Sequence, residues 1–271
     1  MHILRLGPFF AFSLLLSVTT IQAQQTTTPA PRDAQAITTL SQALAAMTGG
    51  TAISDATLTV NVTRTSGSDE QTGTGTLSEL GNNLAKTSLQ LSDGEHEQVI
   101  NQSGATPVGS WSNPDGVVHS MAAWNCWTPA AWFLPTALIS NILNSPSIAV
   151  SYIGTLVENG QTVVDIRFWQ QVNSVDPSDQ TGAVIASLST ADLFLNTTSG
   201  LPTALDFTTH ADSNSNVNIS TEIQFNNYQT FNNVTVPSDI QQYINNSLLL
   251  DMQMQSATFN SGLTPSSFTI D

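Results

Sequence analysis

The chain has 271 residues, of which 40% are hydrophobic and only 9% are charged, whereas ordinary soluble domains contain about 25% charged residues. Five basic residues stand against twenty acidic ones, which gives a net charge of −15. Phosphate binding requires clustered Lys and Arg, so this balance excludes nucleic acid as a partner. A chain of this length buries enough surface to form a large apolar core.

The N-terminus has the three parts of a secretory signal peptide. Arg5 supplies a positive charge, residues 6–18 form an apolar run, and the segment IQA ends in the small residue Ala23. The apolar run is shorter than the roughly 20 residues that span a membrane. We predict a signal peptide over 1–23, cleaved after Ala23, a periplasmic or secreted protein, and no stable membrane span after cleavage. The only cysteine is Cys126, so neither lipid attachment at the cleavage site nor an internal disulfide is expected.

A polar segment rich in Pro and Thr follows at 24–32 and is typical of a linker. Residues 33–271 are then expected to form a single domain. Its first element is a helix over 33–48, because apolar residues recur at helical spacing before a Gly-Gly stop, and Asp33 suits the positive end of the helix dipole. The apolar positions are Ile37, Leu40, Leu44 and Met47.

After Gly50 the hydrophobic period falls to two, which indicates β-strands. ATLTVNVTR places Leu58, Val60 and Val62 on one face, and Asn159-Gly160 divides two apolar runs as a hairpin turn does. No alternation of strands and helices points to a parallel sheet. The pattern predicts an α+β fold with one antiparallel sheet of roughly ten strands.

One segment interrupts this pattern. AAWNCWTPAAWFLPTALISNIL, residues 122–143, contains three of the five tryptophans and no charged side chain. Helical spacing of apolar residues extends over 129–144, and Pro135 should kink or split that helix. Leaving so many tryptophans in water is unfavourable, since each buries about 150–250 Å². The segment should therefore pack against the sheet.

Two interpretations of this segment remain open: it fills the concave side of the sheet as core, or it lines a cavity for an apolar ligand. A membrane-surface helix is disfavoured because such helices carry Lys and Arg on a polar face. If there is a cavity, we expect aromatic and long apolar side chains of this segment and the sheet to line it. These candidates are Trp111, Trp124, Trp127, Trp132, Phe133, Leu138, Phe168, Phe225, Met252 and Met254.

Motifs for catalysis or metal binding are weak. Asp115, His119 and Ser120 could form a hydrolytic triad, but no Gly-x-Ser-x-Gly elbow surrounds a serine. DSNSNVN begins like a calcium loop, yet Val217 stands where that loop requires Gly. Cys126 has no neighbouring basic residue in the sequence to activate it. No catalytic residue, metal or cofactor is predicted.

Arg167 lies on the same face of a predicted strand as Asp165 and Trp169. A cross-strand ion pair, worth under about 1 kcal/mol, is the simpler interpretation of this arginine. The alternative is an anchor for an anionic head group inside a concave sheet.

Several segments resemble the strand–turn units of the lipoprotein-carrier superfamily (LolA-, LppX- and RseB-like proteins). These are TGTGTLSELGNNLAKTSLQL, LFLNTTSGLPTALDFTTHADSN, NISTEIQFNNYQTFNNVTVPSDI and QMQSATFNSGL. The order of elements over 33–262 is also similar to that of exported bacterial proteins of this group. The resemblance implies a half-barrel, in which one strongly curved antiparallel sheet wraps an N-terminal helix and an inserted helical segment. Arg64 and Arg167 are both candidates for the basic strand residue of the lipoprotein chaperones, and that role is carried over to neither.

The resemblance implies a non-enzymatic exported protein that binds a lipid or another apolar small molecule in the concave cavity. A second hypothesis is a periplasmic sensor or scaffold with a filled core, which docks an envelope protein partner. A hydrolase that uses Asp115, His119 and Ser120 ranks third.

Overall fold

The structure is a computed structural model, and it describes residues 29–81, 83–158, 160–172 and 178–270. The predicted signal peptide over 1–23 and the first part of the predicted linker lie outside these residues. The last part of that segment, from 29 to 32, contacts the edge of the sheet: Val150 N donates to Pro31 O at 2.8 Å, and Asp33 N donates to Val150 O at 2.9 Å. The ordered domain therefore begins before residue 33.

The described residues form thirteen strands in one antiparallel sheet, with three α-helices and two 3-10 turns. The strands are β1 (Asp55–Ser66), β2 (Asp69–Leu80), β3 (Leu84–Leu91), β4 (Gly94–Asn101), β5 (Val108–Ser112), β6 (Val118–Ser120), β7 (Ile148–Glu158), β8 (Gln161–Gln170), β9 (Ala191–Asn196), β10 (Pro202–Ala211), β11 (Asn214–Phe231), β12 (Val234–Ile244) and β13 (Ser247–Phe259). The helical elements are α1 (Ala34–Thr48), η1 (Asn125–Trp127), α2 (Pro135–Asn144), α3 (Thr181–Ser189) and η2 (Pro265–Phe268).

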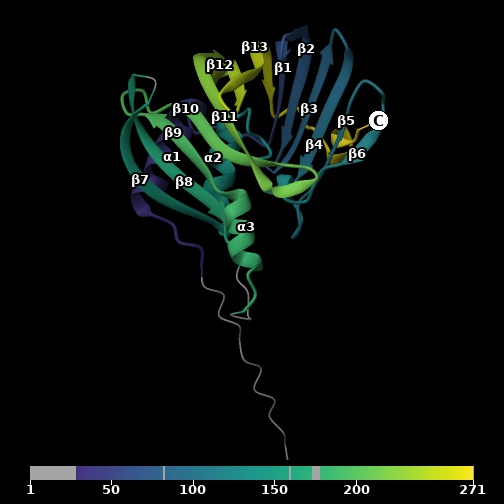
Figure 1. The fold of residues 1–271 in the computed structure, drawn as a ribbon. Coiled ribbons are helices and arrows are strands. Elements are labelled where there is room, and N and C mark those ends of the chain that lie inside the picture. Colours follow the sequence, from purple (N-terminus) through teal and green to yellow (C-terminus); the bar gives the residue numbers. More distant parts are fainter. Residues whose placement is uncertain (1–28, 82, 159, 173–177, 271) are drawn as a thin grey trace, which may run out of the picture.

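The predicted half-barrel is confirmed, with more strands than the ten expected. The strand order is β6-β5-β4-β3-β2-β1-β13-β12-β11-β10-β9-β8-β7, so the first and last strands pair in the middle and β6 and β7 form the two edges. The curved sheet wraps around α1 and α2 (Figure 1). Among the strands not anticipated are β5 and β6, which are too short for alternation to reveal them.

Local sequence explains α1 as predicted. The Asp33 side chain caps the helix by accepting a hydrogen bond from Ala36 N at 2.9 Å. Gly49 ends it in the left-handed conformation, with φ 58°. Its buried face is formed by Ala36, Leu40, Ala43 and Met47.

Tight turns join several neighbouring strands. The predicted hairpin at 159–160 is present, because Glu158 pairs with Gln161 across β7 and β8. Asn232 and Asn233 have φ of 49° and 67° between β11 and β12, and Asn245 and Asn246 repeat this pattern before β13. Two successive positive φ values are typical of a type I′ turn, and Asn tolerates this conformation better than most residues.

The predicted helix over 129–144 is wrong in its first third. The helix α2 begins only at Pro135, and the earlier residues form turns after η1. Proline has no N–H to continue an existing helix, and it forces the preceding residue out of the helical region. Leu134 accordingly is extended, with φ −129° and ψ 91°. Pro135 therefore divides the segment between β6 and β7, residues 121–147, which we call the insert.

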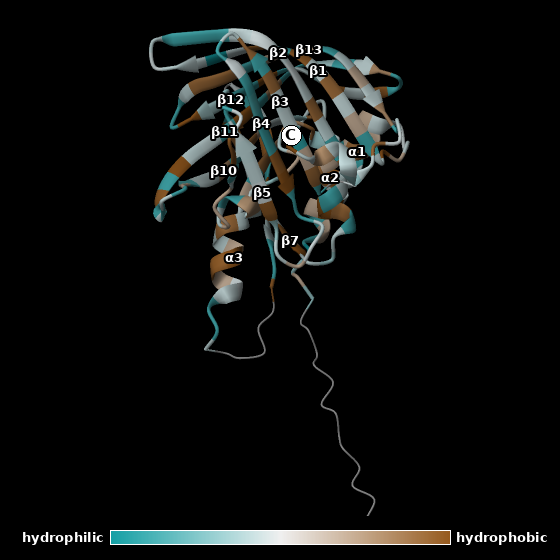
Figure 2. Cartoon of the chain, turned by 90° about the vertical axis from the view of Figure 1, so that its right-hand side faces the viewer, coloured by the Kyte–Doolittle hydropathy of each residue, from teal (hydrophilic) through white to brown (hydrophobic). Residues whose placement is uncertain are grey.

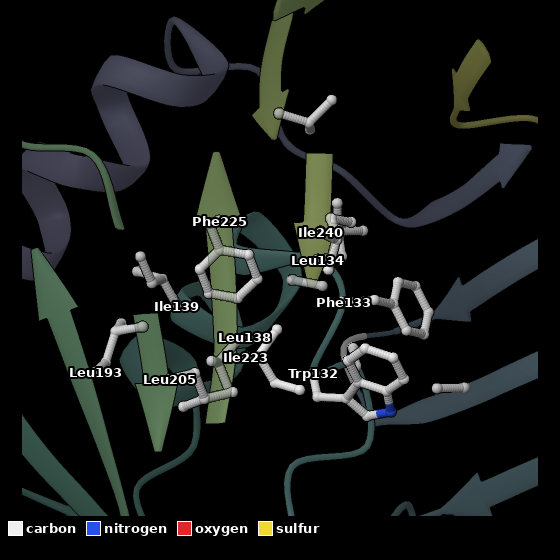
Figure 3. Close-up of a cluster of buried hydrophobic side chains, with 14 of the residues drawn as sticks. Trp132, Phe133, Leu134, Leu138, Ile139, Leu193, Leu205, Ile223, Phe225 and Ile240 are labelled. Carbon is white, nitrogen blue, oxygen red and sulfur yellow. The ribbon is translucent and has the colours of Figure 1, made fainter. Parts of the chain in front are cut away.

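The insert contributes much of the apolar core. Figure 3 shows its side chains Trp132, Phe133, Leu134, Leu138 and Ile139 beside Leu193, Leu205, Ile223, Phe225 and Ile240 of strands β9 to β12. Phe133 has no exposed surface, and α1 adds its buried face to the same cluster. The concave side of the sheet is thus largely filled by packed side chains.

The helix α3 was not predicted. It connects β8 to β9 and stands at one end of the sheet (Figure 1), where Figure 2 shows a hydrophobic stretch on it. Its sequence is apolar on most sides, so no helical periodicity stands out, and Val184 is 53% exposed. Its last residue, Ser189, is buried and accepts a hydrogen bond from Gln170 N of β8 at 2.9 Å.

Candidate functional site

A cavity of about 300 Å³ lies at the end of the half-barrel where the insert crosses between the two sheet halves. One wall comes from the β2–β3 and β4–β5 loops, a second from the start of β7 and the end of β8, and a third from the insert. The lining residues are Asn83, Gln102, Gly104, Ala105, Pro107, Trp127, Pro129, Ala130, Ala131, Leu138, Asn141, Ile142, Ser145, Ser147, Ile148, Phe168, Trp169, Gln170, Val172 and Ser189.

The lining combines apolar side chains with neutral polar ones. Trp127, Leu138 and Phe168 supply large apolar surfaces, whereas amide and hydroxyl groups such as those of Asn83 and Gln170 supply hydrogen-bonding atoms. None of the lining residues carries a charge. Small-molecule sites are lined mainly by apolar groups with a few polar ones, and this lining has a larger share of neutral polar groups. The lining therefore favours a neutral or apolar molecule over an ion.

Gln102 fixes one end of the insert to the first half of the sheet. It follows β4, and its Nε2 donates hydrogen bonds to Cys126 O at 2.9 Å and to Thr128 O at 2.7 Å. The Thr128 hydroxyl also donates to Asn125 O at 2.8 Å. These bonds position Trp127, which lies between the two acceptors, at the pocket wall.

Arg32 fixes the other end of the insert. Its guanidinium donates to Ile142 O at 2.8 Å, Leu143 O at 3.0 Å, and Ser145 O and Ile148 O at 2.9 Å each. A cation at the C-terminal end of α2 also interacts favourably with the helix dipole. Three of the four acceptors belong to residues that line the pocket. Arg32 therefore holds the wall formed by the end of α2 and the start of β7.

Of the ten predicted cavity-lining residues, some line this pocket, some belong to the packed core and two lie elsewhere. Three of them line this pocket, and they are Trp127, Leu138 and Phe168. Five belong to the packed core, away from this pocket, and they are Trp132, Phe133, Phe225, Met252 and Met254.

Of the remainder, Trp111 stacks on His119 with ring centroids 4.3 Å apart, and Trp124 is half-buried with its indole Nε1 unpaired. The pocket is thus smaller and more peripheral than a cavity spanning the whole concave face.

Several pocket residues were missed at the sequence level. Trp169 and Gln170 are the last residues of β8. The alternation of apolar and polar residues along this strand predicts which face each side chain lies on, but it does not predict a pocket at the end of the strand. Gln102 gave no signal at all. Arg32 lies in a segment predicted to be a linker. The scarcity of basic residues, five in the whole chain, was the only signal that pointed to it.

The residues considered for catalysis and metal binding have other contacts. Asp115 Oδ1 accepts a hydrogen bond from Val117 N at 2.9 Å, while His119 stacks on Trp111. Asp212 accepts from Asn125 Nδ2 at 3.1 Å. Within the described residues, no group of three or more His, Cys, Asp or Glu side chains is arranged to hold a metal ion.

Arg167 does not face the concave side. Its Nε and Nη2 donate to the two carboxylate oxygens of Asp192 at 2.7 and 2.9 Å, on the face of the sheet opposite the core. The cross-strand ion pair is therefore confirmed, and the anchor inside the concave sheet is wrong. Cys126 is buried, and burial, with a smaller contribution from Asp212, raises the pKa of its thiol. A raised pKa keeps the thiol protonated and unreactive.

No helix among the described residues is both long and apolar enough to cross a membrane.

Comparison with known proteins rests on structure alone. No protein-family model matches the sequence, and no curated protein matches it significantly. A putative outer membrane lipoprotein-sorting protein domain from Vibrio parahaemolyticus superposes with a TM-score of 0.54 at 12% identity, covering 86% of this chain and 96% of that one. A LolA superfamily protein from Nitrosomonas europaea gives 0.52 at 10% identity, covering 86% and 97%.

A DUF1329 family protein from Desulfovibrio piger gives a TM-score of 0.53 at 8% identity, covering 86% of this chain and 97% of that one. These identities establish likeness of fold and leave function to be argued from the site. All three matches extend over most of both chains. The chain therefore has the lipoprotein-carrier fold, the unclosed antiparallel half-barrel of LolA superfamily proteins.

Proposed function

We propose that this protein is exported and binds one apolar, lipid-like molecule in the pocket between the insert and the two halves of the sheet, without catalysing a reaction. The observation that carries the proposal is the uncharged lining of the pocket, in which Trp127, Leu138 and Phe168 meet from the insert and β8. Apolar surface removed from water contributes about 25 cal/mol per Å² to binding.

The size of the pocket limits the ligand. Ligand sites commonly have volumes of about 300–1,000 Å³, and this pocket, at about 300 Å³, is at the lower end of that range. A single short acyl chain or one end of a longer chain suits this volume better than a lipid with several chains. Amides at the wall, such as those of Asn83 and Gln170, would bind a neutral head group by hydrogen bonds.

The predicted cellular location of the protein supports this proposal. A predicted signal peptide would take the chain to the periplasm or out of the cell, where lipids and lipid-modified proteins are handled. One of the similar structures carries the description of a putative lipoprotein-sorting domain. The mature chain would then begin at Gln24.

Native mass spectrometry and fluorescence quenching would test the proposal. We expect the mature chain, purified without detergent, to retain a lipid-sized molecule. A bromine-labelled dodecanoic acid should quench its tryptophan fluorescence, more weakly in Trp127→Phe but fully in Trp111→Phe, since Trp127 and Trp169 line the pocket and Trp111 does not.

A pocket-filling variant provides the matched comparison. Ala130 lines the pocket, whereas Ala137 is equally buried in the insert but does not line it. Ala130→Leu should weaken binding of the fatty acid by about tenfold or more, which corresponds to about 1.4 kcal/mol. Ala137→Leu adds the same side-chain volume to the insert, with the same risk of overpacking, but it should leave fatty-acid binding unchanged. Absence of any bound lipid and of quenching, or equal losses in both variants, would refute the proposal.

A second candidate function, docking of an envelope protein, is favoured by the edge strand β7. Among the described residues, only 31–33 contact its outer edge, and Ile153 and Val157 on it are 49% and 71% exposed. Exposed edges accept an additional strand from a partner. An Ile153→Lys, Val157→Lys variant should lose a partner recovered by the wild type in a pull-down from an envelope extract, while it keeps fatty-acid binding.

A further inference from the structure

The face of β7 to β11 opposite the main core carries a cluster of carboxyl groups. We call it the carboxyl cluster, and it consists of Glu158, Asp165, Asp192, Asp206 and Glu222. Register brings its members together: Asp206 of β10 is directly opposite Asp192 of β9 on one side and Glu222 of β11 on the other. Like charges directly opposite one another destabilise a sheet.

Too few groups are available to neutralise these carboxylates. Arg167 of β8 is the cation of the cluster, and both of its hydrogen bonds go to Asp192. Asp165 is only 6% exposed and its Oδ1 has no hydrogen-bond partner. The buried Oδ1 of Asp206 and Oε2 of Glu158 also lack partners.

In the part of the chain that the structure describes, the elements packed around the cluster add no further positive charge. The helix α3, which packs against β8 and β10, contains no ionisable side chain. On β12, the residue opposite Glu222 is Tyr243. On the same face, beside the carboxyl groups, Val163, Phe194 and Ala204 form a small apolar cluster of their own. Asp165 is a buried residue, while Asp206 is partly exposed at a surface hollow. A carboxyl oxygen that is buried and unpaired in such surroundings favours the protonated form or a bound cation.

The arrangement favours protons over a metal ion. No group of carboxyl side chains among the described residues converges with the geometry that a metal requires. Burial raises the pKa of Asp206 to about 7, with further contributions from Glu222, Glu158, Asp192 and Asp165. Burial and then Asp192 raise the pKa of Asp165 to about 6, against a smaller opposing effect of Arg167.

We propose that the carboxyl cluster is a proton-responsive lock, which holds β7 to β11 together when it is protonated and loosens them when it ionises. The direction follows from linkage. A carboxyl group that is harder to ionise in the folded state binds more protons there than in the unfolded chain. It therefore stabilises the fold at acidic pH, and this stabilisation is lost as pH rises from about 4, the unfolded value, to about 7.

Thermal unfolding of the mature chain at about pH 5 and about pH 8 tests the lock. We expect the wild type to melt several degrees lower at the higher pH. Asp206→Asn, a neutral isostere of the protonated side chain, should melt higher than wild type at about pH 8 and should show a smaller difference between the two conditions. Asp69→Asn provides the control, because Asp69 is an exposed residue at the start of β2.

Two further measurements keep the proposal testable if a variant fails to fold. Carbon-13 NMR of the aspartate carboxyl groups in the wild type should show an inflection well above pH 5. Hydrogen exchange, corrected for intrinsic pH effects, should show β8 to β10 losing protection at high pH while β1 to β3 do not. Inflections all below pH 5, or an unchanged pH difference in Asp206→Asn, would overturn the proposal. Stabilisation at about pH 8 by calcium or spermidine that requires Asp206 would also overturn it, because the cluster would then be a cation site.

Discussion

Removal of Arg32 tests whether a residue ahead of α1 supports the pocket wall. Arg32→Ala eliminates four hydrogen bonds from a guanidinium to backbone carbonyls, at 2.8 to 3.0 Å. Two of the acceptors, Ile142 O and Ile148 O, belong to buried residues, whereas Leu143 and Ser145 are partly exposed. We expect water to replace the arginine at the exposed pair but not at the buried pair.

The expected loss of stability follows from the two buried carbonyls that would be left without a donor. Each buried carbonyl left unsatisfied costs about 1–3 kcal/mol, and the lost interaction with the helix dipole adds about 0.5 kcal/mol. At the lower end of these values, the free energy of unfolding should fall by about 3 kcal/mol. For a chain of this size, each kcal/mol lowers the melting temperature by about 2–4 °C, so we expect a decrease of about 6–12 °C.

Calorimetry of the mature chain at neutral pH measures this change, with two variants for comparison. Arg32→Lys should recover about half of the loss, because an ammonium group cannot reproduce the fork of the guanidinium. Arg64→Ala removes an arginine whose contacts are single long bonds of 3.4 Å to Gln71 and His96, and should have little effect. A melting temperature for Arg32→Ala within about 2 °C of wild type would refute the reasoning.

Three further predictions address the core, the insert and the C-terminal segment. Phe133→Ala should lower the free energy of unfolding in urea by about 3–5 kcal/mol, because Phe133 has no exposed surface, whereas the exposed Val157→Ala should change it by less than about 0.5 kcal/mol. Gln102→Ala should weaken fatty-acid binding and increase hydrogen exchange at residues 125–128, since Gln102 holds the carbonyls of Cys126 and Thr128; unchanged exchange would contradict this role. Burial works to raise the pKa of Asp55, but hydrogen bonds from Ser261, Gly262 and Ser54 together lower it. Asp55→Asn should therefore cost about 1–3 kcal/mol at neutral pH and progressively less as pH falls below about 4, and an equal cost at all pH values would argue against these bonds.

Local patterns were sufficient to predict α1 and one antiparallel sheet, whereas the half-barrel was implied by the family resemblance. The apolar spacing of α1, its cap at Asp33 and the hairpin at 159–160 depend on residues close in sequence, and the structure confirms them. Alternation along the strands likewise indicated one antiparallel sheet. The start of α2 was misplaced because helical spacing extends across Pro135, although proline favours the first turn of a helix over its interior.

The pocket depends on contacts that no local pattern records. Arg32 and its carbonyl acceptors are separated by 110–116 residues. Whether a tryptophan fills the core, as Trp132 does, or lines a pocket, as Trp127 does, depends on which loop of the sheet lies opposite it. The carboxyl cluster was equally hidden, since Asp192, Asp206 and Glu222 come together only through the register of three strands.

The pairing of β1 with β13 has a consequence for how the chain folds. Ala56 lies opposite Phe259, so the ladder in the middle of the sheet joins residues about 200 positions apart, whereas each half is a meander of neighbouring strands. Pairings between distant residues form slowly because their loop-closure entropy must be overcome first. The hairpins of each half can thus form early, whereas the pairing of β1 with β13 in the middle of the sheet forms only after the last strand has been added. Until β13 arrives, β1 and β12 present two unpaired edges, and the partly folded chain is open to strand addition at its middle as well as at its margins.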